Sequence, residues 1–320
     1  MSARLVTIFG GSGFVGRHLV RVLAKRGWRV RVAVRRPDLA GHLQPLGAVG
    51  QIQAVQANVR NAASVARALV GADAVINLVG ILTESGRQTF GAVQALGART
   101  VADAVAKAGI AQFVHVSAIS ADKNSSSDYA VSKAYGEQAV REAVKDAVIL
   151  RASVIFGPED RFFNRFAALA RFSPVMPLIG GGETRFQPVY VGDVAAAIVA
   201  ALDGKAKAGA TYELGGPEVR SFREVLQYIL QETGRTRMPL SIPFALARIP
   251  ASFLQVLPGA PLTIDQLNLL QHDNVVSAEA IREGRTLAGL GIAPTAYESV
   301  APSYLYRYRK HGQFERARSA

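Results

Sequence analysis

The stretch Gly-Gly-Ser-Gly-Phe-Val-Gly at residues 10–16 decides the fold, because it stands between an apolar run at residues 5–9 and a helical pattern at residues 18–23. A strand, a glycine turn and a helix N-terminus therefore follow one another. Glycines at positions 10, 13 and 16 allow a tight turn, and the helix dipole there favours a bound pyrophosphate. The spacing GxxGxxG differs from the GxGxxG dinucleotide fingerprint, so a purely structural glycine turn is the alternative.

The next strand, at residues 29–34, ends in Arg35 and Arg36, about 20 residues after the glycines. An Asp or Glu at this place would accept hydrogen bonds from the ribose 2′-OH of NAD(H), whereas a guanidinium suits a 2′-phosphate. The two arginines therefore predict NADP(H) as the cofactor. The alternative is a pair of solvated surface arginines, with the nearby Asp38 weakening the phosphate hypothesis.

Strand-like and helical segments then alternate along the chain. This alternation predicts an α/β fold, a Rossmann-type doubly wound parallel sheet with right-handed crossovers, followed by a smaller, mostly helical C-terminal lobe. The expected strands lie at residues 51–56, 74–80, 113–117 and 148–151, and the expected helices at residues 62–70 and 90–108. We predict an NADP(H)-binding domain at residues 1–157 with 186–214, a lobe at 158–185 with 215–303, and a basic aromatic tail at 304–320.

Composition excludes several kinds of site. The chain has no cysteine, so it has no disulfide, thiolate zinc site, cysteine-ligated iron–sulfur cluster or cysteine nucleophile. Its five histidines show no metal-ligand spacing, and we expect no metal. The net charge of +13 favours acidic partners, but no nucleic-acid-binding motif accompanies it, so we expect no nucleic acid.

The ends of the chain and its most apolar helix bear on localisation. The first expected strand begins within a few residues of Met1, so we expect no signal peptide. The most apolar helix-like run, at residues 194–202, is far shorter than the ~20 residues that span a bilayer. We therefore expect no transmembrane helix and a chain that is soluble or peripheral.

Tyr129 and Lys133 stand four residues apart on a helix introduced by the serines at 125–127, so they share one helix face. A lysine there can hold the nicotinamide ribose and lower the pKa of the tyrosine, so that the phenol exchanges a proton with a carbonyl or alcohol. Tyr-x-x-x-Lys is common by chance in helices. It becomes informative here because it follows a glycine-rich nucleotide fold.

With these residues, the chain resembles the short-chain dehydrogenase/reductase superfamily in its extended or atypical branch. The matching elements are residues 10–16, 77–80, Ser117, the Tyr129/Lys133 pair and residues 153–157, and the match resumes at 187–194 and 212–217. In that superfamily the 153–157 loop closes over the nicotinamide. The catalytic Ser or Thr usually stands one or two positions beyond Ser117, where this chain has Ala118 and Ile119. Without Ser117 or Ser120 as a substitute, a substrate carbonyl would lack a polarising donor.

Together, the motifs and the resemblance define the candidate site. Asn58 could bind an adenine edge, although Asn is equally typical of a strand end. The catalytic candidates are Tyr129 and Lys133, which are either active or vestigial. The candidate cofactor-binding residues are Gly10, Ser12, Gly13, Phe14, Val15, Gly16, Arg35, Arg36, Asn58, Leu78, Val79, Gly80, Ser117, Tyr129, Lys133, Val154 and Ile155.

Residues 156–164, 261–267 and 273–277 narrow the resemblance to the NADPH-binding accessory subunits of respiratory complex I, the alpha subcomplex subunit nine family, over nearly the whole chain. This resemblance implies a tightly held NADPH and a non-catalytic, stabilising role on the peripheral arm, near the quinone site and on the cytoplasmic side of the inner, energy-transducing membrane. The implied partners are other complex I subunits. The alternatives are an active NADPH-dependent reductase, epimerase or dehydratase using Tyr129 and Lys133, and a redox-sensing binding module.

The C-terminal residues 304–320 interleave tyrosines and a phenylalanine with arginines and a lysine. Aromatic bodies with cationic heads suit an anionic membrane surface or an acidic partner protein. The alternative is a frayed, solvated terminus.

Overall fold

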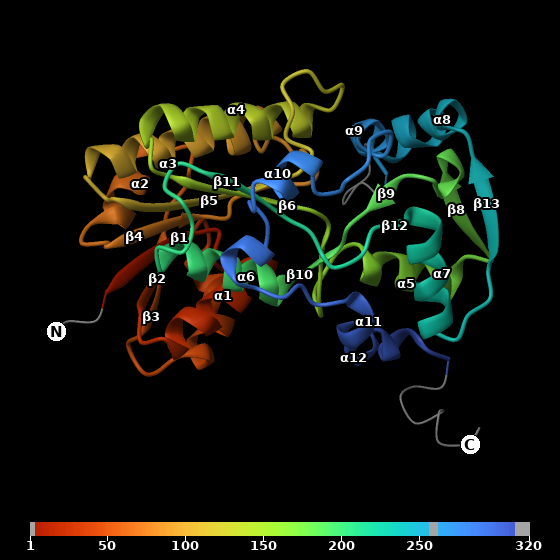
Figure 1. Cartoon of the computed structure of the whole chain (residues 1–320), viewed down its shortest axis with the longest axis horizontal. Coiled ribbons are helices and arrows are strands. Elements are labelled where there is room, and N and C mark those ends of the chain that lie inside the picture. Colours follow the sequence, from red (N-terminus) through yellow and green to blue (C-terminus); the bar gives the residue numbers. More distant parts are fainter. Residues whose placement is uncertain (1–3, 256–261, 311–320) are drawn as a thin grey trace. The chain divides into compact units, whose positions relative to one another are not determined.

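The computed structural model describes residues 4–255 and 262–310 (Figure 1). Within them the chain forms two compact units. The first comprises residues 4–152, 192–214 and 277–293, and the second comprises residues 153–191, 215–255, 262–276 and 294–310. Compared with the predicted domains, this division assigns residues 153–157 and 186–191 to the second unit and residues 277–293 to the first.

The first unit is built on a seven-stranded parallel sheet, which confirms the predicted fold class. Its spatial order is β11-β6-β5-β4-β1-β2-β3. The strands are β1 (Leu5–Phe9), β2 (Arg29–Val34), β3 (Ile52–Gln56), β4 (Ala74–Asn77), β5 (Gln112–Ala118), β6 (Val148–Ala152) and β11 (Thr211–Leu214). Because β1 lies between β2 and β4, the strand order reverses beside β1, and ligands of such sheets bind at the carboxyl ends of the strands at this switch point.

Helices cover both faces of this sheet, with α2, α3 and α4 on one face and α1 and α6 on the other (Figure 1). Strands β1 and β4 are buried at every residue, as expected for parallel strands covered on both sides. The helices are α1 (Phe14–Lys25), α2 (Ala62–Leu69), α3 (Leu96–Lys107) with a π-helical turn before it (Gly91–Ala95), α4 (Asp128–Ala143), α6 (Val191–Leu202) and α10 (Ala278–Arg282); Pro37–Leu46 and Ala288–Leu290 are 3₁₀-helical.

The second unit is mostly helical and has an aromatic core that includes Phe156, Phe163, Phe186, Phe222 and Tyr297. Its helices are α5 (Phe163–Phe172), α7 (Phe222–Glu232), α8 (Phe244–Leu254), α9 (Ile264–Leu269), α11 (Tyr297–Val300) and α12 (Pro302–Leu305), with a 3₁₀ turn at Tyr306–Tyr308. Its short strand pairs are β7 (Ile155–Phe156) with β10 (Val189–Tyr190), β9 (Arg185–Phe186) with β12 (Arg220–Ser221), and β8 (Val175–Ile179) with β13 (Met238–Ile242). Gly180–Gly182 form a further 3₁₀ turn.

The start of the predicted C-terminal tail packs into the second unit. Tyr304 is only 4% exposed, and its hydroxyl donates to Asp160 Oδ2 at 2.8 Å. Arg309 forms an ion pair with Glu232. A buried phenol and a paired guanidinium cannot at the same time dock on a membrane or partner, so residues 304–310 contribute less to such a surface than the sequence predicts. Residues 311–320 of the tail lie outside the described residues.

Candidate functional site

The glycine turn after β1 is shaped to hold an anion. Gly10 has a φ of +79°, which favours glycine, and the Gly13 N–H donates to the Gly10 carbonyl at 3.1 Å. A Cβ on Gly16 would lie 2.3 Å from the Gly11 carbonyl oxygen, so α1 packs directly against the turn. Because the N-cap residue Gly13 has no side chain, it leaves the first-turn amides of α1 open to a phosphate. Ser12 belongs to the turn, and Phe14 and Val15 are the first two residues of α1.

Residues 78–80 lie against this turn at the switch point. A Cβ on Gly10 would meet the Val79 nitrogen at 3.3 Å, so the two loops are in contact. The Leu78 N–H donates to the Phe9 carbonyl at 3.0 Å, and the Val79 N–H donates to Asn77 Oδ1 at 3.1 Å. The structure therefore brings together, at one edge of the sheet, the predicted residues that follow β1 and β4.

Helix α4 carries the predicted Tyr–Lys pair to the same edge. Lys133 is 7% exposed, and its Nζ lies 3.2 Å from where a Cβ on Gly80 would stand. Burial lowers the pKa of Lys133 to about 8, while the nearby Glu137 opposes that shift. The Tyr129 ring meets Phe90 edge-on at 5.8 Å and lies 5.9 Å from Lys133 Nζ. One continuous site is thus formed by the glycine turn, residues 78–80 and the Tyr–Lys pair.

Asn77 belongs to the matching stretch at residues 77–80, but neither Asn77 nor His115 is among the predicted site residues. The two stand opposite each other on β4 and β5. Asn77 Nδ2 donates to His115 Nδ1 at 3.2 Å, so the imidazole accepts with that nitrogen. Both side chains are buried. Burial, followed by the charge of Lys133, lowers the pKa of His115 to about 3 and keeps the ring neutral. A polar residue inside an otherwise apolar strand was the available signal for this pair.

The two predicted phosphate-binding arginines differ in their surroundings. The Arg36 guanidinium binds the Asp38 carboxylate with N–O distances of 2.7 and 3.0 Å. The hydrogen bonds between the two groups raise the pKa of Arg36 and lower the pKa of Asp38. Within the described part of the chain, the exposed Arg35 makes no hydrogen bond or ion pair. Arg35 is therefore the arginine that is free to reach a 2′-phosphate.

Three further predicted residues have structural partners. Asn58 Oδ1 accepts the Arg60 N–H at 3.1 Å, which shapes the turn before α2 and leaves the adenine contact a prediction. Val154 and Ile155 belong to the second unit. The Val154 N–H donates to Asn274 Oδ1 at 3.1 Å, and Ile155 pairs with Val189. Their predicted place over a nicotinamide stays a prediction.

Ser117 lies buried at the carboxyl end of β5, and its hydroxyl has no hydrogen-bond partner among the described residues. A buried hydroxyl without a partner is costly unless a ligand satisfies it. The open amides of the glycine turn, the buried Lys133 and this hydroxyl are the groups that a dinucleotide would use. The residues present therefore fit a nicotinamide dinucleotide.

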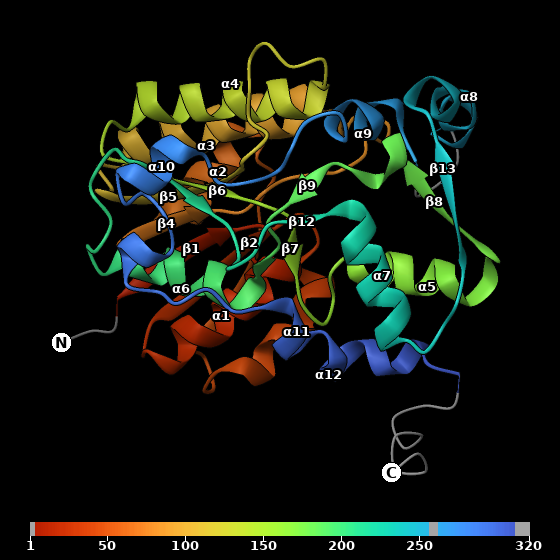
Figure 2. The same ribbon diagram turned by 45° about the vertical axis from the view of Figure 1, so that its right-hand side comes forward.

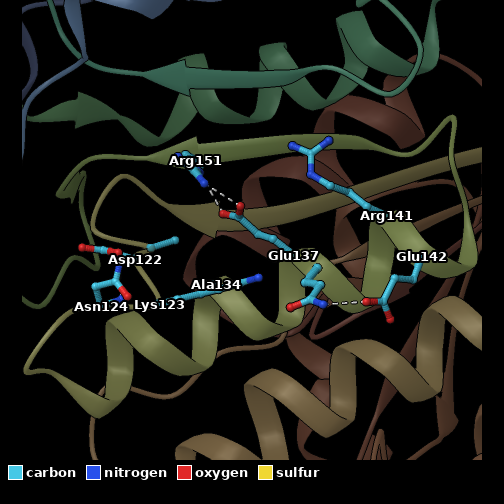
Figure 3. Close-up of a pocket in the computed structure, with 10 residues that line it drawn as sticks. Asp122, Lys123, Asn124, Ala134, Glu137, Arg141, Glu142 and Arg151 are labelled. Atoms are coloured by element: carbon cyan, nitrogen blue, oxygen red, sulfur yellow. Dashed lines mark hydrogen bonds and ion pairs between the residues drawn. The ribbon is translucent and has the colours of Figure 1, made fainter.

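A pocket of about 570 Å³ lies on another side of α4 (Figure 3). Arg151 and Glu137 face each other there, with N–O distances of 2.7 and 2.9 Å, and Arg151 also approaches Glu213. Its charged lining residues are three acids and three bases, namely Asp122, Glu137, Glu142, Lys123, Arg141 and Arg151. This balance favours neither an anionic nor a cationic ligand, so we assign the Glu137–Arg151 pair to bracing α4 against the sheet.

In the residues that the structure describes, no three His, Asp or Glu side chains gather to hold a metal ion. In the same residues, every helix is too short or too polar to cross a membrane.

The chain is similar to proteins of a known family. Residues 6–215 match the NAD dependent epimerase/dehydratase family. The chain is 35% identical to NADH dehydrogenase [ubiquinone] 1 alpha subcomplex subunit 9, mitochondrial, of Arabidopsis thaliana, covering 98% of this chain and 80% of the relative. It is 38% identical to ceramide reductase of Caulobacter vibrioides, covering 61% of this chain and 60% of the relative.

Among solved structures, DesIV, a dTDP-glucose 4,6-dehydratase from Streptomyces venezuelae with NAD bound, has a TM-score of 0.72 and 22% identity, covering 95% of this chain and 96% of the other. That likeness shows the fold. The chain belongs to the NAD dependent epimerase/dehydratase family, and it also belongs with the alpha subcomplex subunit 9 relatives, which it matches over 98% of its own length. The resemblance seen in the sequence is confirmed.

Proposed function

We propose that this chain is an NADPH-binding, non-catalytic accessory subunit of respiratory complex I. The observation that carries the proposal is the similarity to a subunit 9 relative over 98% of the chain, whereas the similarity to the reductase covers 61%. We further propose that it binds other subunits of the peripheral arm, near the quinone site and at the membrane surface. These finer assignments follow from the resemblance stated above.

The residues of the site have distinct roles in this proposal. When bound, NADPH supplies a hydride donor and three phosphate groups. The amides of the 10–16 turn would hold the pyrophosphate, and Arg35 would pair with the 2′-phosphate. Lys133 and Tyr129 would hydrogen-bond ribose hydroxyls, and Ser117 would satisfy its buried hydroxyl on the ligand.

Two features favour a structural role for the nucleotide over turnover. Ala118 and Ile119 occupy the positions where catalytic relatives usually have a Ser or Thr, so a substrate carbonyl would lose a polarising donor unless Ser117 or Ser120 supplied it. A nucleotide held at about a hundred times its Kd stabilises the folded chain by about 2.7 kcal/mol. The bound cofactor would thus act as part of the fold.

The test is to tag the chain in its own host, extract membranes in mild detergent and run a native gel stained for NADH:quinone oxidoreductase activity. We expect the chain to migrate with that activity at stoichiometric level and to release NADPH on denaturation. Recovery as a free protein only would reject the proposal. NAD in place of NADPH would reject the Arg35 assignment alone.

The second candidate function is an NADPH-dependent reductase. Tyr129 and Lys133 favour it, because a lysine that stays cationic below pH ~8 stands one turn from a phenol that could protonate a carbonyl oxygen. The partial match to ceramide reductase points in the same direction. A carbonyl panel with NADPH would show turnover that disappears in Tyr129→Phe with the fold intact. If no carbonyl oxidises NADPH, this candidate fails.

A further inference from the structure

Helix α8 of the second unit is apolar on two sides. Ala247 and Ala251 are buried and pack with Ile179 and Leu267. On another side, Leu246, Ile249 and Phe253 are 58%, 61% and 75% exposed, and their spacing of three and four residues places them in one row. We call these three residues the α8 face. The side of a surface helix that faces away from the core is normally polar, whereas the α8 face is apolar.

The strand that leads into α8 continues this exposed apolar character. Met238 and Leu240 of β13 are exposed and stand two residues apart, so they share one face of the strand. Figure 1 and Figure 2 show β13 running beside β8 and onward to α8. At the other end of the β8/β13 pair, Phe172, the last residue of α5, is exposed three residues before β8 begins.

The charges of the same segment are of one sign. Residues 233–264 contain no Asp or Glu and three arginines. Each guanidinium donates to a neutral oxygen: Arg235 to the Tyr308 carbonyl at 3.0 Å, Arg237 to the Ala170 carbonyl at 2.8 Å, and Arg248 to Asn268 Oδ1 at 3.2 Å. Burial and then the charges of Arg237 and Arg171 lower the pKa of Arg235, so positive groups gather here. This positive charge is complementary to an anionic surface.

We infer that the α8 face docks on the surface of an anionic phospholipid membrane, with Leu246, Ile249 and Phe253 at the boundary of headgroups and acyl chains. A short apolar helix face accompanied by basic residues and no acidic ones is typical of interfacial helices. At 11 residues α8 is too short to span a bilayer. The inference rests on the membrane-surface location proposed above and names the part of the chain that makes the contact. It places membrane contact on α8 and β13, and not on the tail residues Tyr304 and Arg309.

The experiment is flotation of the purified full chain with phosphatidylcholine vesicles, with and without phosphatidylglycerol. We expect the chain to float with the anionic vesicles and to bind less at high salt. In Ile249→Ser/Phe253→Ser, binding should fall more than about tenfold, because two exposed apolar side chains no longer enter the interface. In Arg171→Gln/Arg248→Gln, it should fall about threefold and lose part of its salt dependence.

The matched control is Val70→Ser/Leu96→Ser, which changes two similarly exposed apolar residues of the first unit and should leave flotation unchanged. Thermal melting checks that every variant is folded. The proposal is overturned if the wild type stays unbound, or if the α8 variant floats as well as the wild type. It is also overturned if the α8 variant instead abolishes self-association seen by sedimentation, which would assign the face to a second copy of the chain. Because vesicles replace complex I here, the accessory-subunit proposal stands or falls separately on the native gel.

Discussion

The candidate cofactor site at the edge of the first unit's sheet, called here the cofactor edge, buries polar side chains, whereas the α8 face of the second unit exposes apolar ones. At the cofactor edge, backbone meets backbone through glycines, and the polar side chains Asn77, His115 and Lys133 are buried and mutually arranged. On α8, the large apolar side chains of the α8 face are exposed, while the small Ala247 and Ala251 on another side of the same helix are buried. The first arrangement can select a small ligand by the positions of its polar groups. The second provides an exposed apolar area on which a larger surface can dock.

The largest effect is expected at Gly16. In Gly16→Ala the new Cβ would lie 2.3 Å from the Gly11 carbonyl oxygen, so the turn and α1 must separate. We expect the free energy of unfolding to fall by about 3 kcal/mol and NADPH binding to disappear, measured by urea denaturation and fluorescence titration. Gly41→Ala is the control, since its Cβ meets nothing within 4 Å. A Gly16 variant as stable as that control would contradict the close packing of turn and helix.

The buried histidine comes next. His115→Leu leaves Asn77 Nδ2 without its acceptor, at a cost of about 2 kcal/mol in the free energy of unfolding, whereas His115→Gln can keep an acceptor and should lose less. The pKa of His115 is lowered to about 3, so at low pH the unfolded chain binds a proton that the folded chain refuses. This contribution to stability is full above pH ~6.5 and is lost as pH falls toward about 3. Acid denaturation curves that coincide for wild type and His115→Leu would oppose a neutral buried ring.

The second unit offers a matched buried hydrogen bond at Tyr304. Tyr304→Phe removes the hydroxyl that donates to Asp160, whose carboxylate remains buried, so we expect a loss of about 1.5 kcal/mol in the free energy of unfolding. NADPH affinity of the folded protein should not change. Titration of NADPH against the variant checks this. A weakened affinity would show that the cofactor edge depends on the core of the second unit.

The smallest effects concern the surface arginines. Arg35→Asp should weaken NADPH binding about tenfold and lower the melting temperature only when NADPH is present, because Arg35 has no intramolecular ion pair to lose among the described residues.

Asp38→Asn should tighten NADPH binding slightly by freeing Arg36, since an exposed ion pair contributes at most about 1 kcal/mol. Equal affinity for NADPH and NADH in the wild type would remove the basis for both expectations.

Local signals explain what could be predicted. The turn at residues 10–16 and the i, i+4 pair of Tyr129 and Lys133 are contained in a few consecutive residues, and the alternation of strands and helices specifies the sheet. Asn77 and His115 are visible in the sequence as polar residues in apolar strands, but their hydrogen bond could not be predicted, because it depends on the register of β4 against β5. Arg35 and Arg36 are adjacent in sequence, and only the side-chain partner Asp38 distinguishes them.

The sequence by itself determined the fold class, because glycine spacing and hydrophobic periodicity act over short distances, and its motifs carried the resemblance to the family. The cofactor-binding residues that it indicates remain a prediction. Only the tertiary structure decided three further matters: that Lys133 is buried beside Gly80, that Tyr304 belongs to a core and not to a free tail, and that one face of α8 stays exposed. Burial is a property of packing between distant segments. A linear pattern can show that a helix is apolar on two sides, but not which side the rest of the chain covers.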